Sequence, residues 1–229
     1  MIDDVTNFRS TLITVVIPVF NQEKYIGRCI RSVLSQQFAR EKYEIIVVND
    51  GSTDKTSFAI DVFQDELVVI NNKKNLGLPA SLNIALAQIK TPYFVRVDAD
   101  DFISSYFLVF LHSFIEDNDY MDAVSCDYNL VDDQGTVISR KNCMDDPIGC
   151  GIIFRTDQII NIGAYDEDFL LHEEQDLRLR FLKKYKIHRL EMALYRYRKH
   201  DKNMTNNKSK ADYFMKNLKS KHKPKKNEI

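Results

Sequence analysis

Apolar residues in the first hundred positions follow two alternating patterns. Residues 12–20, LITVVIPVF, form an almost continuous β-branched run, which is typical of a strand covered on both faces. Residues 23–38 carry apolar side chains near helical spacing and predict a helix. Strands alternating with single helices predict βαβ units, so the fold class is α/β with a mostly parallel, Rossmann-like sheet. The pattern recurs with strands predicted at 43–50, 66–72 and 93–97, and helices at 51–63 and 78–89.

The pattern changes after Asp101. A helix is predicted at 107–115, and two strands are predicted on either side of a turn at 132–135. The second half therefore forms a smaller, mixed region beside the parallel sheet. Its remaining predicted elements are a strand at 149–155, a helix at 173–185 that begins at its acids, and short strands at 186–190 and 193–200.

The formal net charge of −1 hides an uneven distribution. Residues 208–229 hold eight lysines against two acids, so this tail carries +6 and residues 1–207 carry −7. An acidic body argues against a nucleic-acid binder, whose basic groups line the folded surface. The tail suits contact with an anionic membrane, and a solvated, flexible end explains it equally well.

Cellular location is indicated by what the sequence lacks. No basic, apolar and small-residue leader opens the chain, and no apolar run is long enough to cross a bilayer. The four cysteines are spaced neither as disulfide pairs nor as zinc ligands, which predicts free thiols. We expect a cytoplasmic protein, with its basic tail as the part suited to the inner face of the membrane.

Polar side chains follow three of the predicted strands, at Asn21, at Asp50, and at Asp98 with Asp100. Ligands of parallel sheets bind beyond the carboxyl ends of the strands. Where the chain turns, Asp98 and Asp100 can converge on one Mg²⁺ or Mn²⁺, and a substrate diphosphate can complete the coordination. Asp50 can accept hydrogen bonds from a base or a ribose, or cap the turn that follows it.

Four segments, in this order and spacing, resemble the nucleotide-sugar-binding half of family 2 glycosyltransferases of the GT-A fold: TVVIPVFNQEKYIGRCIRSVLSQQ, EIIVVNDGSTDKT, NLGLPASLN and YFVRVDADD. GCGIIFRTDQIINIGAYDEDF and HEEQDLRLR are similar to the family's acceptor-side segment and Glu-Asp helix. The resemblance implies a nucleotide-sugar-binding half at 1–102, an acceptor-binding and catalytic half at 103–205 of the same domain, and a flexible tail at 206–229.

The resemblance also implies roles for single residues. Asp50 is expected to read the base, Asp98 to contact the ribose or a metal-linked water, and Asp100 to bind the metal. The expected border of the base pocket is Pro18, Phe20 and Asn21.

The family's catalytic base is the Asp of its Glu-Asp pair, and this chain has Glu174 at that position. Glu174 is therefore the expected base, with Glu173 and Asp176 as alternates. Such a carboxylate takes the proton of an acceptor hydroxyl as that hydroxyl attacks the sugar, and a single displacement inverts the anomeric carbon.

The late segment YRYRKH is similar to the family's Arg-x-His, which makes His200 a candidate metal ligand and Arg198, with Arg196, a candidate phosphate contact. Many relatives carry an Arg where this chain has Leu82, a side chain that cannot bind a diphosphate. Lys73 or Lys74 is the expected substitute for that arginine, and His172 is a candidate for the acceptor pocket.

The resemblance implies an inverting enzyme that uses Mn²⁺ or Mg²⁺ and transfers a sugar from a UDP-sugar or similar donor to a glycan or lipid-linked acceptor in surface polysaccharide synthesis. A nucleotide-sugar-binding scaffold without turnover is the alternative, because Glu174 departs from the family. A sugar-nucleotide pyrophosphorylase fits less well, since no glycine follows the first strand until Gly27. An Asp-x-Asp phosphatase would carry its acids after the first strand.

Overall fold

The computed structural model describes residues 11–200 and 208–223. Its strands are β1 (Ile13–Val19), β2 (Tyr43–Asn49), β3 (Val68–Asn71), β4 (Tyr93–Arg96), β5 (Phe102–Ile103), β6 (Ala123–Val131), β7 (Val137–Lys141), β8 (Ile152–Arg155) and β9 (Ile187–Arg198). Its α-helices are α1 (Ile26–Leu34), α2 (Thr56–Asp61), α3 (Leu78–Leu86), α4 (Phe107–Glu116), α5 (Thr156–Asn161), α6 (Glu173–Phe181) and α7 (Lys208–Lys221).

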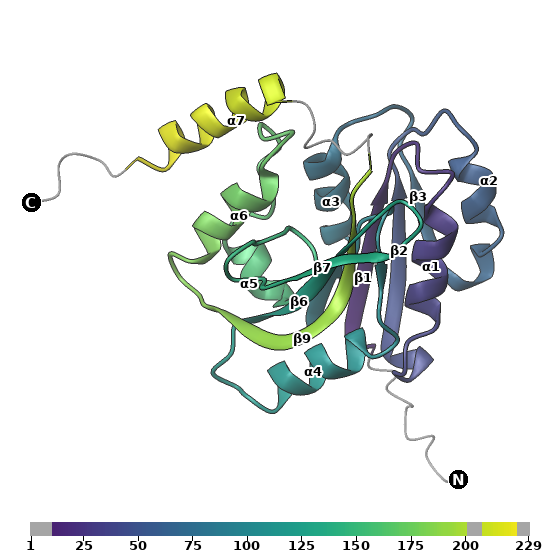
Figure 1. Ribbon diagram of the computed structural model, residues 1–229, viewed down its shortest axis with the longest axis horizontal. Helices are drawn as coiled ribbons and strands as arrows, with labels where there is room; N and C mark the ends of the chain where they lie inside the picture. The colour runs from purple at the N-terminus through teal and green to yellow at the C-terminus, as the bar shows by residue number, and fades with distance from the viewer. Residues whose placement is uncertain (1–10, 201–207, 224–229) are drawn as a thin grey trace, which may run out of the picture.

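The described strands form one nine-stranded sheet of order β3-β2-β1-β4-β8-β6-β9-β5, with β7 paired to β6. The first four strands are parallel, as their alternation with helices predicts. β8 joins β4 antiparallel, and the sheet then continues through the second half of the chain (Figure 1). The two halves of the sequence therefore share a single sheet.

Helices cover both faces of the sheet, which explains the continuous apolar runs of its strands. Side chains of β1 alternate between the two faces: Val15 and Ile17 pack with α1 and α4, and Val16 packs with α3 and α6. Burial on both sides fixes the register of β1, because a shift by one residue would exchange the two faces.

Three elements differ from the sequence predictions. The two short strands predicted at 186–190 and 193–200 are one strand, β9, whose pairing with β6 shifts register near Asp127. α5 and the two-residue β5 were not predicted, since both are too short for a periodic signal. Pro18 lies within β1, which pairs regularly with β2 as far as Val19. Proline is accommodated there because pairing with β4 stops at Val16.

The basic tail, predicted to be flexible at 206–229, contains a helix in its described part. This helix, α7, lies beside the first turn of α6 (Figure 1). Leu218 is buried, Lys221 pairs with Asp166 and Asp176, and His222 lies 2.8 Å from Asp176. Some of the lysine charge that suggested membrane contact thus neutralises acids of the folded domain.

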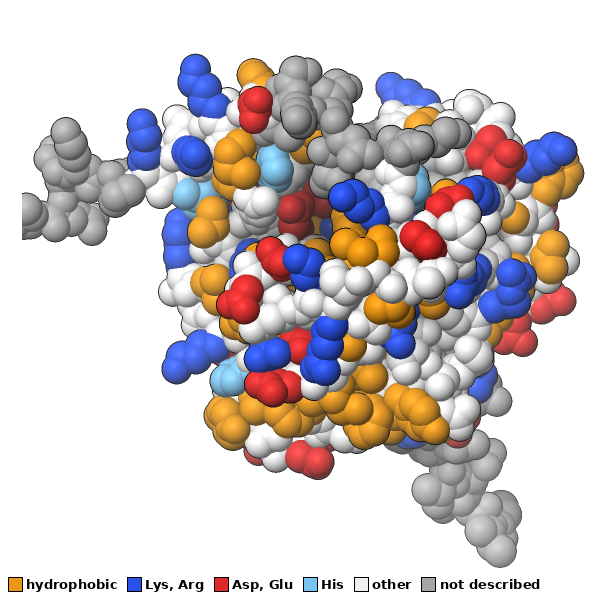
Figure 2. All heavy atoms as spheres, viewed as in Figure 1, with side chains coloured by type: hydrophobic (Ala, Val, Ile, Leu, Met, Phe, Trp, Pro, Cys, Tyr) orange, Lys and Arg blue, Asp and Glu red, His pale blue; other side chains and the backbone are white. Residues whose placement is uncertain are grey.

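The face drawn in Figure 2 carries a concentration of apolar side chains. Hydrophobic side chains gather along the lower edge of the face drawn in Figure 2, in the region that α4 occupies in Figure 1. Tyr106 and Phe110, at the start of this helix and within it, are both exposed. In the part of the chain that the structure describes, no helix is both long and apolar enough to pass through a bilayer.

Candidate active site

The loop after β4 carries the Asp-x-Asp acids, and a buried arginine organises it. Arg96 ends β4, and its Nε and Nη2 donate to the two carboxylate oxygens of Asp98 at 2.6 and 3.1 Å. Its Nη1 donates to Glu173 at the start of α6, at 3.0 Å. Burial alone disfavours the charged guanidinium, but the two carboxylates hold the pKa of Arg96 well above its usual range. Arg96 therefore ties the acidic loop to α6.

The second acid of the motif meets a residue a hundred positions away. Asp100 Oδ2 lies 3.0 Å from His200 Nε2, just beyond the end of β9. Burial and then the charge of Asp98 raise the pKa of Asp100, and His200 opposes this effect. A carboxylate and an imidazole at this distance can share one cation, as the sequence motif predicts for these two residues.

The third acid of the loop is structural. Asp101 is buried and accepts hydrogen bonds from the Tyr195 hydroxyl at 2.8 Å and from the Arg198 amide at 2.7 Å. Asp98, Asp101 and Cys150 also lie close enough together to hold an ion. Asp101 already accepts two hydrogen bonds and a thiol is a poor ligand for hard cations, so Asp100 with His200 is the alternative ligand pair for Mg²⁺ or Mn²⁺.

Arg198, the predicted phosphate contact, is buried and holds backbone groups. Its exposed fraction is 2%, and its Nε donates to the Asp100 carbonyl at 2.7 Å. Its guanidinium also donates to the carbonyls of Asp132 and Asp133 and lies over the Tyr25 ring. Arg198 thus fixes the backbone that presents Asp100, and burial has removed it from the surface.

The carboxyl ends of β1 and β2 form the adjoining rim. Asn21 has a positive φ of 53°, its amide donates to Ser52 Oγ at 3.0 Å, and its Oδ1 accepts from the Thr53 amide at 2.8 Å. Phe20 beside it is 41% exposed, which suits contact with a ligand, whereas Pro18 is buried within β1. Asn21, one of the residues expected to border the base pocket, therefore joins the loops that follow β1 and β2.

Asp50 supports the neighbouring loop through its carboxylate. It is buried and accepts hydrogen bonds from Asn72 Nδ2 and from the amides of Leu76 and Gly77 at 2.8–2.9 Å. These donors occupy much of its hydrogen-bonding capacity. A nucleotide base could bind only to the lone pairs of Asp50 that these three donors leave unused. The observed hydrogen bonds of Asp50 hold the loop at 72–77 in place.

The remaining sequence candidates are spread around this rim. Lys73 and Lys74 are exposed on the loop that Asp50 supports. Leu82 is fully buried in the core, and Arg196 donates to the backbone carbonyl of Ala193 at 2.7 Å. His172 precedes α6 with a left-handed φ of 64°. Among these candidates, the two lysines are the ones that offer an exposed cation.

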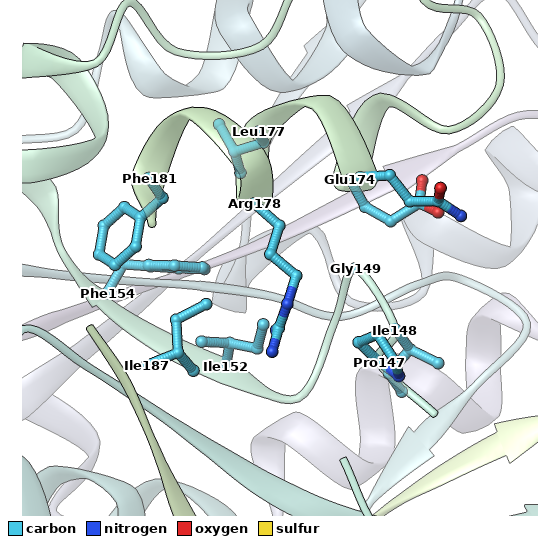
Figure 3. A pocket seen from close by; sticks show the side chains of 11 residues that line it. Pro147, Ile148, Gly149, Ile152, Phe154, Glu174, Leu177, Arg178, Phe181 and Ile187 are labelled. Carbon is cyan, nitrogen blue, oxygen red and sulfur yellow. The ribbon is translucent and has the colours of Figure 1, made fainter. Parts of the chain in front are cut away.

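α6 presents the three candidate bases in different environments. Glu173 is buried against Arg96, and burial raises its pKa while Arg96 opposes that shift. Asp176 is completely buried and pairs with Arg180 at 2.8 Å and with two residues of the tail. Glu174 is partly exposed and lines a pocket beside Gly149 (Figure 3).

A glycine leaves room for this arrangement. A Cβ atom at Gly149 would lie 2.8 Å from Glu174 Cβ and 3.0 Å from Arg96 Nη1. Gly149 therefore lies next to both Glu174, the expected base, and Arg96, which holds Asp98. The acids of α6 and those of the loop after β4 thus lie near the same glycine. Sequence reasoning missed Arg96 and Gly149, although a charged residue ending an apolar strand signals the need for buried acidic partners.

Solved structures define the class of this fold. The TarS fragment 1–349 of Staphylococcus aureus, solved with UDP-GlcNAc, matches 95% of this chain with a TM-score of 0.77 and 22% identity, over 68% of its own length. The mannosyltransferase PcManGT of Pyrobaculum calidifontis, solved with GDP-Man and Mn²⁺, matches 95% with a TM-score of 0.73 and 17% identity, over 66% of its length. The architecture is that of a GT-A glycosyltransferase domain, as predicted.

Sequence comparison then gives the family. The profile of glycosyl transferase family 2 matches residues 14–169, more than half of the chain, and the chain belongs to this family. An uncharacterized glycosyltransferase of Haemophilus influenzae is 38% identical over 116 residues, which cover 49% of this chain and 35% of that protein. The poly(ribitol-phosphate) β-N-acetylglucosaminyltransferase TarS of Staphylococcus aureus is 32% identical over 108 residues, 46% of this chain and 19% of TarS. The chain thus spans a minor part of both relatives.

Proposed function

We propose that the chain is the catalytic domain of an inverting, metal-dependent glycosyltransferase. It transfers a sugar from a nucleotide diphosphate sugar, with UDP-sugars as the first candidates, to a hydroxyl of a glycan or lipid-linked acceptor. One observation carries the proposal: acids after β4, a histidine after β9 and a partly exposed glutamate on α6 surround a single region of the sheet edge. UDP-GlcNAc and GDP-Man in the two solved structures support a donor of this class.

The chemistry of the donor set fits a divalent cation. Asp100 and His200 would hold it, with Asp98 beside them, and Mn²⁺ in PcManGT supports the choice of Mn²⁺ or Mg²⁺. When bound, such an ion neutralises the diphosphate leaving group. Arg198 holds the Asp100 backbone in place, and Arg96 orients the Asp98 carboxylate.

Glu174 acts as the base in this proposal. Glu173 and Asp176 are buried in ion pairs, and Glu174 is the acid of this group with a partly exposed side chain. It takes the proton of the acceptor hydroxyl while the hydroxyl oxygen bonds to the anomeric carbon. The bond from that carbon to the diphosphate oxygen breaks on the opposite side, so the anomeric configuration inverts.

The nucleotide lies at the rim formed by Phe20, Asn21 and the loops that Asp50 supports. Pro18 lies within β1 beneath this rim and shapes it through the backbone. The exposed Lys73 and Lys74 are within the same loop region and can attract the diphosphate. Surface polysaccharide synthesis at the inner face of the membrane is the proposed setting, which the poly(ribitol-phosphate) activity in the name of TarS supports.

A thermal-shift screen tests this function. Nucleotide diphosphates and nucleotide sugars are added with and without Mn²⁺, because a ligand that binds only the folded state raises its stability. We expect a shift with UDP or another diphosphate that requires the metal. A metal-dependent shift without sugar transfer to any acceptor would instead favour the scaffold without turnover, and no shift with any nucleotide would refute donor binding.

A further inference from the structure

Two side chains of opposite charge on α6, Glu174 and Arg178, have no partner among the described residues. Glu174 and Arg178 are four residues apart on one helix, the order and spacing that favour an ion pair. Within the described ranges, however, neither side chain has an ion pair or a hydrogen bond to any residue of the chain. Figure 3 shows the two side chains leading away from each other, with Arg178 directed toward Ile152 and Ile187. Both charges are therefore available to a ligand.

Arg178 is unusual among the described arginines. Arg96 and Arg180 are saturated by carboxylates and carbonyls, and Arg31, which also lacks a carboxylate, lies over the Phe63 ring. Arg178 is partly buried, and this burial lowers the pKa of its guanidinium. An unpaired guanidinium in such surroundings is stabilised when an anion reaches it.

Arg178 lines the same pocket as Glu174, the expected base. Glu174, Gly149 and Arg178 line it together with apolar side chains of Ile148, Ile152 and Phe181 (Figure 3). Its interior measures about 20 Å³, enough for a water-sized group but far too small for a sugar ring. A ligand therefore lies across the mouth, and a single oxygen atom of its substituent enters the pocket beside Arg178. The apolar walls strengthen the attraction between the guanidinium and an oxyanion.

We propose that Arg178 binds an oxyanion substituent, a phosphate or a carboxylate, of the same acceptor whose hydroxyl Glu174 deprotonates. The inference rests on the proposed function for the role of Glu174, and it adds the chemical class of the acceptor. A guanidinium matches both anions through paired N–H donors. The acceptor is then an anionic molecule with a hydroxyl close to its charged group.

Three ligands with the same carbon skeleton test this subsite: glycerol 3-phosphate, glycerate and glycerol. Their dissociation constants are measured by NMR titration of the protein, with and without UDP and Mn²⁺. We expect at least one of the two anions to bind about tenfold more tightly than glycerol, in line with a charge-assisted hydrogen bond. The stronger of the two identifies the substituent as phosphate or carboxylate.

Variants of Arg178 and Arg31 distinguish anion binding at Arg178 from a general effect of the net charge of the protein. We call the dissociation constant of glycerol divided by that of the anion the preference for the anion. Arg178→Gln should reduce this ratio to about one, and Arg178→Lys should retain part of it. Arg31→Gln removes the same charge from α1 and should leave the preference unchanged. An equal preference in Arg178→Gln, or no preference in the natural protein, would overturn the proposal. Failure to bind UDP would refute the proposed donor site alone, since the titration without nucleotide still tests Arg178.

Discussion

At the scale of residues, two adjacent acids on α6 differ in what surrounds them. Glu174 is partly exposed and has no hydrogen bond within the described ranges, so its replacement should affect chemistry rather than folding. Glu174→Gln should lower kcat by roughly 10²- to 10⁴-fold, the usual contribution of a positioned base. UDP binding with Mn²⁺ should be unchanged. Steady-state kinetics and a binding titration on the same variant check both expectations, and full activity in Glu174→Gln would exclude it as the base.

Glu173→Gln provides the matched comparison one position earlier. This change removes a charged partner from the buried Arg96, at 3.0 Å, and should lower the free energy of unfolding by about 1–3 kcal/mol. Denaturant unfolding of both variants compares the two positions directly. A destabilisation by Glu174→Gln that equals or exceeds that of Glu173→Gln would make Glu174 the structural acid of the pair and count against its role as the base.

At the scale of elements, the carboxylate of Asp127 links the three strands β6, β7 and β9. Asp127 of β6 is buried and accepts hydrogen bonds from Arg189 of β9 and Arg140 of β7, all at 2.8–2.9 Å. Hydrogen bonding by Arg189 is the main reason that its pKa is lowered to about 2. A depressed carboxyl pKa adds stability above the pKa of the unfolded chain, near 4, and this contribution is lost as the pH falls toward 2.

The ion pairs of Asp127 predict that the natural protein and Asp127→Asn differ in stability by an amount that depends on pH. Asp127→Asn should lower the free energy of unfolding on the order of 2 kcal/mol at neutral pH, and the deficit should shrink as the pH falls from about 4 toward 2. Urea unfolding of both proteins between neutral pH and roughly pH 2.5 measures the deficit. A deficit that stays constant over this range would show that the charge of Asp127 contributes nothing.

The C-terminal helix is fastened by one apolar side chain as well as by charges. Leu218 of α7 is 4% exposed, whereas Tyr213 on the same helix is 62% exposed. Leu218→Ala should weaken docking by about 2 kcal/mol and raise amide hydrogen exchange in α7 roughly thirtyfold. Tyr213→Ala should leave exchange unchanged. Equal exchange in all three proteins would mean that α7 does not dock through Leu218.

At the scale of the whole molecule, the parallel half of the sheet follows from sequence because its strands are continuous apolar runs with local helical crossovers. The second half is less predictable: β9 pairs with β6 about 60 residues away, and no local pattern encodes that register shift. The same limit applies to the site. The sequence singles out the acids as candidates, but the buried roles of Arg198 and Asp101 depend on contacts nearly a hundred positions apart.

The tail illustrates how composition can mislead. Its lysines suggested a solvated end or a membrane contact, yet Lys221 pairs with the fully buried Asp176 of α6. A lysine-rich segment gives no sign of such a partner, because the acid becomes buried, and in need of a cation, only when the domain folds.

The central claim is a metal-dependent donor site built on Asp100. Isothermal titration of UDP, with and without Mn²⁺, into the natural protein and Asp100→Asn tests it most directly. We expect binding that requires Mn²⁺ in the natural protein and is weakened by about a hundredfold or more in the variant, whose unfolding should remain cooperative. Equal affinity in the two proteins, or UDP binding that is indifferent to the metal, would contradict the account.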